Sequence, residues 1–439
     1  MSEQLLAGTG KLMITPTFGA ELSGFVARKE KCRGVHDPLY ARALVLTDGK
    51  KKIALVAADL IGVDAGLLAK VRAKVCLLTD LEPSAVLVSA THTHSGPATL
   101  AKAFLGRVDP DYLEGLADNL AGAVYLANQN LEPVRVFLGE GVCRSVGKNR
   151  RKKEGPTDPQ VLVLRLQGTK GPKALLVNYA CHPVVLGPDN LLVTADYPYY
   201  LIRTLEQLYP GTEVIFFNGA AGDINTGHET AESIQGKSDP RRTFQEAERL
   251  GRILAGVVLA ASENAVMQRS SPLRYRAEET SLPLEESGTA GFYREEAEKW
   301  QKLAVKLKRK GAAFGEYRQA EVWAEWARTM AELREAGKLE PAVKVELAAF
   351  ALGEIEFTTL PGEFFHEFAL MIKRARAPRP VFVLGYTNHN IGYVAPAAFY
   401  DKGGYEINEA YRYYGLPSRF PRGTGEKIVQ VLLAMLELL

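Results

Sequence analysis

The stretch that decides the fold is Ala85-Val-Leu-Val-Ser-Ala-Thr-His-Thr-His-Ser-Gly-Pro97. Its first half is a run of apolar and β-branched residues, which is typical of a strand buried on both faces of a sheet. The run ends at His92 and His94, and the Gly-Pro pair that follows stops the strand and opens a turn. On extended backbone these two imidazoles would point to the same side, because side chains alternate along a strand. Two histidines at the carboxyl end of a buried strand indicate a metal site; the alternative is loop histidines bonded to backbone.

The sequence on either side of this stretch predicts an α/β fold. Runs with the composition of strands occur at residues 8–16, 39–46, 52–60, 134–138, 161–166, 173–179, 213–217, 344–352, 355–360 and 381–386. Segments with helical periodicity alternate with them, at residues 65–78, 111–128, 199–208, 244–263 and 428–439. This alternation predicts a mixed β-sheet core flanked by helices.

Residues 284–340 differ in composition from the rest of the chain. They are rich in Glu, Lys, Arg and Ala, carry all three tryptophans and contain almost no β-formers. The pattern predicts two long amphipathic helices, broken near Gly311 or Gly315. We therefore expect a single domain over residues 1–439, with 284–340 as a helical insertion within it. The insertion has two interpretations, a structural scaffold or dimer arm and a lid over a pocket.

Polar residues of the same kind follow several predicted strands. His182, Glu363 and Tyr393 each come shortly after one, as His92 and His94 do. Two histidines and a carboxylate leave an open coordination position at zinc, where a water molecule can ionise near neutral pH. These residues are far apart in the sequence, so spacing alone does not establish a site.

The bulk composition is that of an ordinary globular protein. The chain carries 54 basic and 51 acidic side chains, a formal net charge of +3, which predicts neither a nucleic acid nor an acidic membrane as partner. No window approaches the roughly 18 continuous apolar residues of a membrane span, and the N-terminus lacks a signal-peptide pattern. The four cysteines have no paired spacing, which favours reduced thiols and a cytoplasmic location.

Several motifs together resemble the neutral/alkaline (non-lysosomal) ceramidase family. They are Thr91-His-Thr-His-Ser-Gly-Pro97, which is the most specific, and the weaker Gly8-Thr-Gly-Lys-Leu-Met-Ile-Thr-Pro16, Gly34-Val-His-Asp-Pro-Leu-Tyr-Ala-Arg42, Ala57-Ala-Asp59, His182-Pro183, Gly222-Asp-Ile224, Leu360-Pro-Gly-Glu363 and Tyr393-Val394. Their order matches that of the family. The resemblance implies a zinc amidase that cleaves the amide bond between a fatty acyl group and a sphingoid base.

The resemblance also implies a set of metal ligands. By position, one zinc ion per chain would be held by His92, His182, Glu363 and Tyr393. Imidazole, carboxylate and phenolate ligands suit zinc without excluding other metals.

The same resemblance implies catalytic roles and one departure. His94 would touch the reacting amide or relay protons, and Arg150 and Tyr405 would donate to the developing oxyanion. The family's Gly-Asp-x-Ser-Pro loop supplies a serine, whereas the corresponding position here is Asn225. Because an amide side chain is no hydroxyl nucleophile, hydrolysis should run directly through metal-activated water.

The expected function is a zinc-dependent hydrolase that cleaves the amide (N-acyl) bond of a small-molecule substrate. It is ceramidase-like, but the lack of the family's extra C-terminal β domain and of a secretion signal favours a cytoplasmic protein with a substrate other than membrane ceramide. Two alternatives stay open: a catalytically silent, metal-containing binding protein, and a metal-dependent hydrolase of esters or other bonds.

Three aspartates lie in predicted turns or helix caps near these histidines: Asp59, Asp196 and Asp223. Turn and cap chemistry, or support that orients the histidines, explains them, and a second metal is the alternative. The remaining histidines have no comparable context: His36, His228, His366 and His389.

Overall fold

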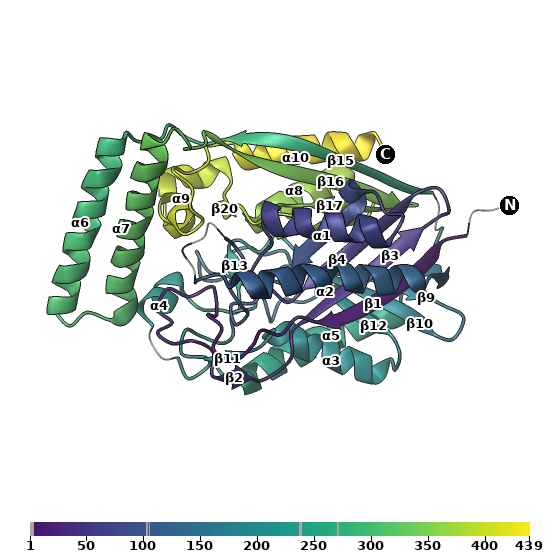
Figure 1. The fold of residues 1–439 in the computed structure, drawn as a ribbon. Coiled ribbons are helices and arrows are strands. Elements are labelled where there is room, and N and C mark those ends of the chain that lie inside the picture. Colours follow the sequence, from purple (N-terminus) through teal and green to yellow (C-terminus); the bar gives the residue numbers. More distant parts are fainter. Residues whose placement is uncertain (1–3, 102–103, 105, 237–238, 270–271) are drawn as a thin grey trace.

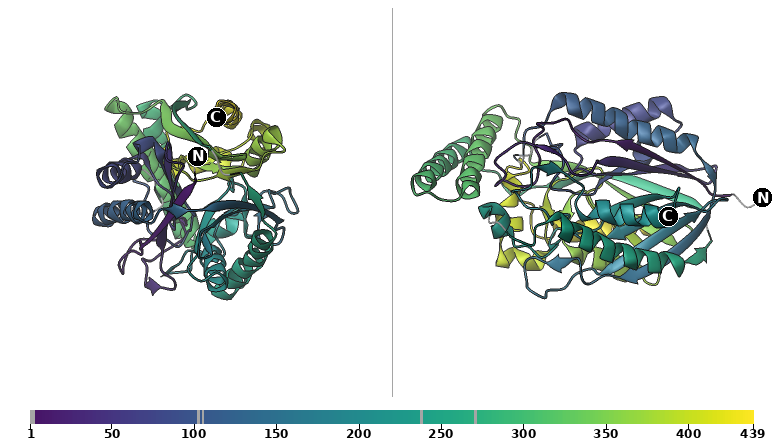
Figure 2. Two further views of the ribbon diagram at one scale, coloured as in Figure 1. Left: turned by 90° about the vertical axis from the view of Figure 1, so that its right-hand side faces the viewer. Right: turned by 90° about the horizontal axis from the view of Figure 1, so that it is seen from below.

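The computed structural model describes residues 4–101, 104, 106–236, 239–269 and 272–439. Within these residues, three larger sheets form the body of the molecule (Figure 1). The sheets share one apolar core, to which each contributes buried side chains such as Leu55, Leu164, Phe217 and Phe357. A pair of helices covers the outer face of each sheet, and Figure 2 (left) shows the three pairs on different sides of the molecule.

The first sheet has the strand order β5-β4-β3-β1-β6. Its strands are β1 (Leu6–Met13), β3 (Tyr40–Thr47), β4 (Lys52–Ala58), β5 (Val86–Ala90) and β6 (Glu132–Pro133). β3 and β4 form the predicted antiparallel hairpin, and β5 pairs with β4 in parallel. Helices α1 (Ala65–Leu78) and α2 (Pro110–Gln129) bury their apolar sides against the outer face.

The second sheet has the strand order β12-β10-β9-β7-β14. Its strands are β7 (Arg135–Val142), β9 (Gln160–Gln167), β10 (Pro172–Tyr179), β12 (Glu213–Asn218) and β14 (Val266–Gln268). β10 and β12 are parallel and the other pairs antiparallel. Helices α3 (Tyr197–Leu208) and α5 (Phe244–Glu263) cover it.

The third sheet has the strand order β15-β16-β17-β19. Its strands are β15 (Leu273–Pro283), β16 (Ala342–Leu352), β17 (Ile355–Thr359) and β19 (Val381–Leu384). β17 and β19 are parallel. Helices α8 (His366–Arg376) and α10 (Thr424–Glu437) pack on its outer face.

The carboxyl ends of β5, β12 and β19 meet at one place and join the three sheets. The backbone N–H of Ala90 donates to the Tyr386 carbonyl over 3.0 Å, and that of Gly385 donates to the Asn218 carbonyl over 2.9 Å. The Asn218 side-chain amide donates in turn to the Thr91 carbonyl over 3.1 Å. Loops that leave three different sheets therefore begin within a few ångströms of one another.

Three two-stranded pairs fix the loops beyond this junction. They are β2 (Gly34–Val35) with β11 (Leu192–Val193), β8 (Lys148–Asn149) with β13 (Ile224–Asn225), and β18 (Glu363–Phe364) with β20 (Tyr393–Val394). Glu363 thus lies on a short strand, and α8 begins only at His366.

The predicted helical insertion is a hairpin of α6 (Ala290–Arg309) and α7 (Phe314–Glu335) between β15 and β16. The break falls at residues 310–313, where Gly311 has a φ of 69° that favours glycine. In Figures 1 and 2 the hairpin stands at one end of the molecule, beside α4 (Thr230–Gln235) and α9 (Tyr405–Asn408) in Figure 1. Among the described residues, no helix is apolar over a length sufficient to cross a bilayer.

The predicted fold class, an α/β fold with a mixed β-sheet core flanked by helices and a helical insertion near residues 284–340, is confirmed. The strands and helices expected from the periodicity of the sequence are present, and α1 and α5 have the predicted ends.

Candidate metal centre

The junction of the three sheets brings together His92, His94, His182 and Glu363. His92 Nε2 lies 3.2 Å from His94 Nε2 and 3.3 Å from Glu363 Oε2. His182 Nε2 lies 2.9 Å from the same carboxylate oxygen. Each of these side chains is buried except that of His94, which is partly open.

His92 reaches the centre by a route that differs from the sequence prediction. β5 ends at Ala90, and His92 has a φ of 71°, so the backbone between the two histidines is not extended. The expectation that strand alternation aligns the two imidazoles was wrong. The two rings nevertheless contact each other edge-on, with their centroids 4.8 Å apart. His92 is held instead by its backbone N–H, which donates to the Leu60 carbonyl over 2.9 Å, and by the Tyr386 ring stacked on it at 4.2 Å.

Hydrogen bonds to backbone carbonyls orient both buried histidines. His92 Nδ1 lies 2.6 Å from the Ile61 carbonyl, and His182 Nδ1 lies 2.7 Å from the Ala221 carbonyl. Because a carbonyl oxygen can only accept, each Nδ1 must donate, and this assigns the tautomer. In the neutral imidazoles both Nε2 atoms then carry lone pairs.

This donor set fits a metal ion. Two imidazole lone pairs and a carboxylate oxygen face one another at 2.9–3.3 Å, a contact that is repulsive unless a proton or a cation lies among them. Imidazole nitrogens whose other ring N–H donates to a carbonyl, combined with a carboxylate, are a common arrangement at zinc. The residues present therefore suit the implied zinc ion.

The charges of the site shift the pKa values of its members. Burial alone would raise the pKa of Glu363, but the adjacent His92 and His182 hold it well below its usual range. Burial and the neighbouring imidazoles hold the pKa of His94 well below its usual value. The pKa of His182 is also lowered by burial, against the opposing effect of Glu363.

Two tyrosines flank Glu363, and only one of them was predicted. Tyr393 is its register partner across the β18–β20 pair, and ligation by Tyr393 stays a prediction. Burial raises the pKa of the Tyr393 hydroxyl well above its usual value, while the nearby Arg150 opposes this effect. The other tyrosine, Tyr414, donates a hydrogen bond from its hydroxyl to Glu363 Oε1.

The predicted Arg150 follows β8 and is held by Glu406 of α9. Its Nε donates to Glu406 Oε1 over 3.0 Å, and Arg151 forms an ion pair with the other carboxylate oxygen. The Arg150 guanidinium also lies over the Tyr393 ring, 5.1 Å from its centroid. Burial would lower the pKa of Arg150, but the proximity of Tyr393 and Glu406 raises it well above its usual value.

A cavity of about 60 Å³ adjoins the centre. All the predicted catalytic residues contribute to its lining: His94, Arg150, Tyr405 and Asn225. His182 and Tyr393 also line it, together with a set of mostly apolar residues: Gly24, Phe25, Val26, Val184, Ser233, Ile234 and Tyr413. Gly24 is required there, because it has a φ of 98° and a Cβ would lie 2.5 Å from the His94 ring.

Asn225 lines this cavity but uses its side chain locally. Its Oδ1 accepts from the backbone N–H of Gly227 over 2.8 Å and from that of His228 over 3.2 Å. Its Nδ2 donates to the His228 carbonyl over 2.6 Å. The amide therefore closes the turn at residues 225–228.

The three aspartates flagged in the sequence lie around the centre rather than in it. Asp59 accepts from the Tyr40 N–H and the Thr91 hydroxyl, and Asp196 caps α3. Asp223 accepts two hydrogen bonds from His366, whose position beside it no motif predicted. Asp223, His366 and Glu367 lie close enough to hold a cation, but these hydrogen bonds account for the aspartate and one ring nitrogen.

Sequence reasoning missed Tyr386, Tyr414, Glu406 and Arg28. Arg28 donates to the His94 carbonyl over 2.9 Å and so fixes the loop that carries this histidine. Tyr386 ends the predicted strand at residues 381–386 and Tyr414 ends a tyrosine-rich segment, and these were the signals that could have found them. Glu406 and Arg28 belong to no motif.

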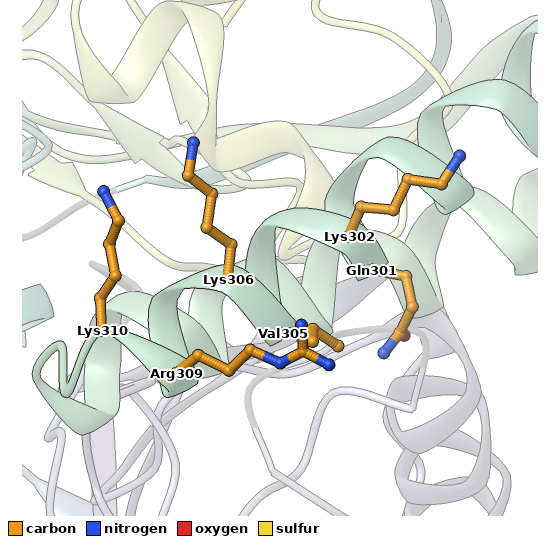
Figure 3. A pocket seen from close by; sticks show the side chains of 6 residues that line it. All are labelled: Gln301, Lys302, Val305, Lys306, Arg309 and Lys310. Carbon is orange, nitrogen blue, oxygen red and sulfur yellow. The ribbon is translucent and has the colours of Figure 1, made fainter.

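A larger hollow of about 530 Å³ lies elsewhere, along α6. Figure 3 shows the side chains that line it: Gln301, Lys302, Val305, Lys306, Arg309 and Lys310. It holds no group that fits the chemistry of the metal centre.

Comparisons with known proteins agree with this fold. A family profile described as "Neutral/alkaline non-lysosomal ceramidase, N-terminal" matches residues 5–214. The neutral ceramidase of Pseudomonas aeruginosa is 27% identical over 215 residues, which cover 43% of this chain and 32% of that protein. The neutral ceramidase of Drosophila melanogaster is 28% identical over 225 residues, covering 46% and 32%. The match thus spans about a third of the length of these curated relatives.

Two solved structures have the same fold. The crystal structure of the neutral ceramidase from Pseudomonas aeruginosa has a TM-score of 0.75 at 20% identity, over 99% of this chain and 74% of that one. A structure described as a ceramidase complexed with C2 has a TM-score of 0.74 at 17% identity, over 98% and 74%.

The fold and the site define an α/β protein with a cluster of histidines and a carboxylate, a candidate metal centre, at the junction of three sheets. The comparisons add a particular similarity: residues 5–214 match the profile of the neutral/alkaline non-lysosomal ceramidases, and nearly the whole chain shares the fold of a solved neutral ceramidase.

Proposed function

We propose that the protein is a zinc-dependent hydrolase that cleaves the amide (N-acyl) bond of a small molecule by means of metal-activated water. One observation carries this proposal: the lone pairs of His92 and His182 converge with the Glu363 carboxylate beside a cavity. The similarity to neutral ceramidases supports the reaction class.

His92, His182 and Glu363 would hold the ion, with Tyr393 as a predicted fourth ligand. A zinc ion bound there would supply a Lewis acid that lowers the pKa of a water molecule and polarises an amide oxygen. Glu363 Oε1 is already engaged by Tyr414, which leaves Oε2 to face the two histidines.

The remaining residues of the cavity have roles that their contacts allow. His94 presents its ring at the cavity beside His92 and can take a proton from the nucleophile and return it to the leaving amine. Arg150, fixed by Glu406, and Tyr405, whose hydroxyl has no hydrogen-bond partner among the described residues, can donate to the oxygen of the scissile amide.

Metal analysis combined with an activity panel tests this proposal. Purified protein should contain about one zinc ion per chain, and His182→Ala should lose it, because this imidazole supplies one of the few protein ligands that would hold the ion. His389→Ala, which changes a half-buried histidine on another loop, is the matched control and should keep the metal. N-acyl amides should be hydrolysed by the wild type and not after chelation. A metal-free wild type with unchanged properties in His182→Ala would overturn the proposal.

A catalytically silent binding protein is the second candidate. The observation that favours it is the engagement of Asn225 in a turn at the place where the related family has a serine. Chelator-sensitive turnover of any acyl amide would exclude this candidate. A parallel series of acyl esters would distinguish an amidase from an esterase that uses the same centre.

A further inference from the structure

The hairpin α6–α7 touches the walls of the cavity rather than standing free of them. Gly315, in the first turn of α7, packs so closely that an added Cβ would lie 1.7 Å from the Ile234 carbonyl and 2.8 Å from the Ala27 side chain. Only glycine allows this approach. Ile234 lines the cavity, and so does Val26, the residue next to Ala27.

A second group of contacts joins α7 to Tyr413, another residue of the lining. Gln319 Nε2 donates to the Tyr413 hydroxyl over 3.0 Å. The Trp323 ring lies 6.5 Å from that of Tyr413, and Trp300 of α6 packs edge-on against Trp323 at 4.6 Å. The hairpin therefore holds two lining residues, Ile234 and Tyr413, through contacts one turn apart on the same helix.

These two residues contribute apolar surface to the cavity. Its lining combines polar groups, among them His94, Arg150 and Tyr405, with apolar ones: Phe25, Val26, Val184, Ile234 and the Tyr413 ring. The volume of about 60 Å³ is far below the roughly 300–1,000 Å³ of pockets that enclose drug-sized ligands. At roughly 10–15 Å³ of such volume for each group the size of a water molecule, there is room for about four to six non-hydrogen atoms.

We propose that the hairpin α6–α7 limits the size of the acyl group, so that the preferred substrates carry a short acyl chain of about four carbons or fewer. This inference rests on the proposed function, which identifies the group bound in the cavity as an acyl chain. The limit itself is set by Ile234 and Tyr413, which α7 holds in place through Gly315 and Gln319.

Binding of alkanoates, the carboxylate products of such a reaction, measures the limit without any turnover. Calorimetric titration of the zinc-loaded protein with acetate, butanoate, hexanoate and octanoate should show affinity rising about fourfold per buried methylene up to butanoate and no further. Ile234→Ala should move the chain length at which the affinity stops rising (the break) to hexanoate or beyond, because it removes apolar volume from the cavity wall. Gln319→Ala should move it in the same direction by releasing Tyr413, and it provides a second variant should Ile234→Ala fail to fold.

Gln301→Ala is the matched control, since it makes the same exchange on the exposed face of α6 shown in Figure 3. Its break should stay at butanoate. Three results would each overturn the size limit. They are an affinity that keeps rising through octanoate in the wild type, an affinity that stops rising at the same chain length in all three variants, and no binding of any alkanoate. If the affinity stops rising at butanoate but the protein hydrolyses no amide, the proposed amidase is rejected and the size limit stands. If the protein hydrolyses amides and the affinity keeps rising with chain length, the size limit is rejected and the amidase stands.

Discussion

His92 Nε2 lies 3.3 Å from Glu363 Oε2, although the first residue follows β5 of the first sheet and the second follows β17 of the third. Their contact depends on the junction at which Ala90 bonds Tyr386 and Asn218 bonds Thr91. A site whose ligands come from different sheets is held by the packing of those sheets, so it should be rigid before any ion binds.

The hydrogen bond from Tyr414 to Glu363 should tune the metal affinity. In Tyr414→Phe the ring is kept and the buried carboxylate oxygen loses its donor, so we expect zinc affinity to fall by about 10- to 100-fold, as for other residues that orient metal ligands. Competition with a chromophoric chelator measures this change. An unchanged affinity would show that Tyr414 is a packing residue only.

The Glu406 carboxylate should be needed to hold Arg150 at the cavity. Its side chain is 3% exposed and pairs with both Arg150 and Arg151. Glu406→Gln leaves two guanidinium groups without their counter-charge, and breaking a buried ion pair costs about 3–5 kcal/mol. Urea unfolding should show this loss, together with a fall in kcat on acyl amides. Glu325→Gln, on an exposed position of α7, should show neither effect.

Asn225 should matter for stability more than for chemistry. Asn225→Ala removes the three hydrogen bonds that close the turn at residues 225–228, and we expect a loss of about 1–3 kcal/mol in the free energy of unfolding. The turnover number per folded, zinc-loaded molecule should stay within about tenfold of the wild-type value, which corresponds to a change of ~1.4 kcal/mol in the activation free energy. A variant that is stable, holds zinc and has lost all turnover would contradict this prediction.

Asp196 should make the stability of the protein depend on pH. Burial raises its pKa to about 6, against the hydrogen bonds that its carboxylate accepts from Leu186, Tyr197 and Val185. The folded state then holds this proton between about pH 4 and pH 6 while the unfolded state does not, so the contribution of Asp196 to stability falls as the pH rises through that window.

Asp196→Asn removes this dependence and keeps a good helix cap. From pH 4 to pH 7, its free energy of unfolding should therefore gain about 3 kcal/mol relative to the wild type, because one pKa unit is worth ~1.4 kcal/mol. Denaturant titrations of both proteins at several pH values give the difference. A difference that is constant with pH would refute the prediction.

Local features were predictable because they depend on neighbours in the chain. The helix at residues 65–78 has its cap at Asp64, and the apolar spacing of α5 defines residues 244–263, so both were found at their correct ends. The buried run of β5 and the polar residues after each strand were also visible. The resemblance to the ceramidase family supplied roles for these residues, and the comparisons support the family.

Other features depend on contacts that no local pattern encodes. The direction of His92 is set by a φ of 71° and by the Ile61 carbonyl, which the rule of strand alternation could not foresee. Tyr414 and Glu406 reach the site from the last part of the chain, where they lie in short helical turns without a motif.

The sequence by itself determined which elements form, and it placed histidines, a glutamate and a tyrosine just beyond the ends of buried strands, because hydrophobic periodicity and turn residues act over a few positions. Only the tertiary structure decided that those strand ends converge, that two imidazoles expose Nε2 to one carboxylate oxygen, and that α7 contacts residues that line the cavity. The physical reason is that the packing of three sheets on one core fixes these distances, and such packing is a property of the whole chain.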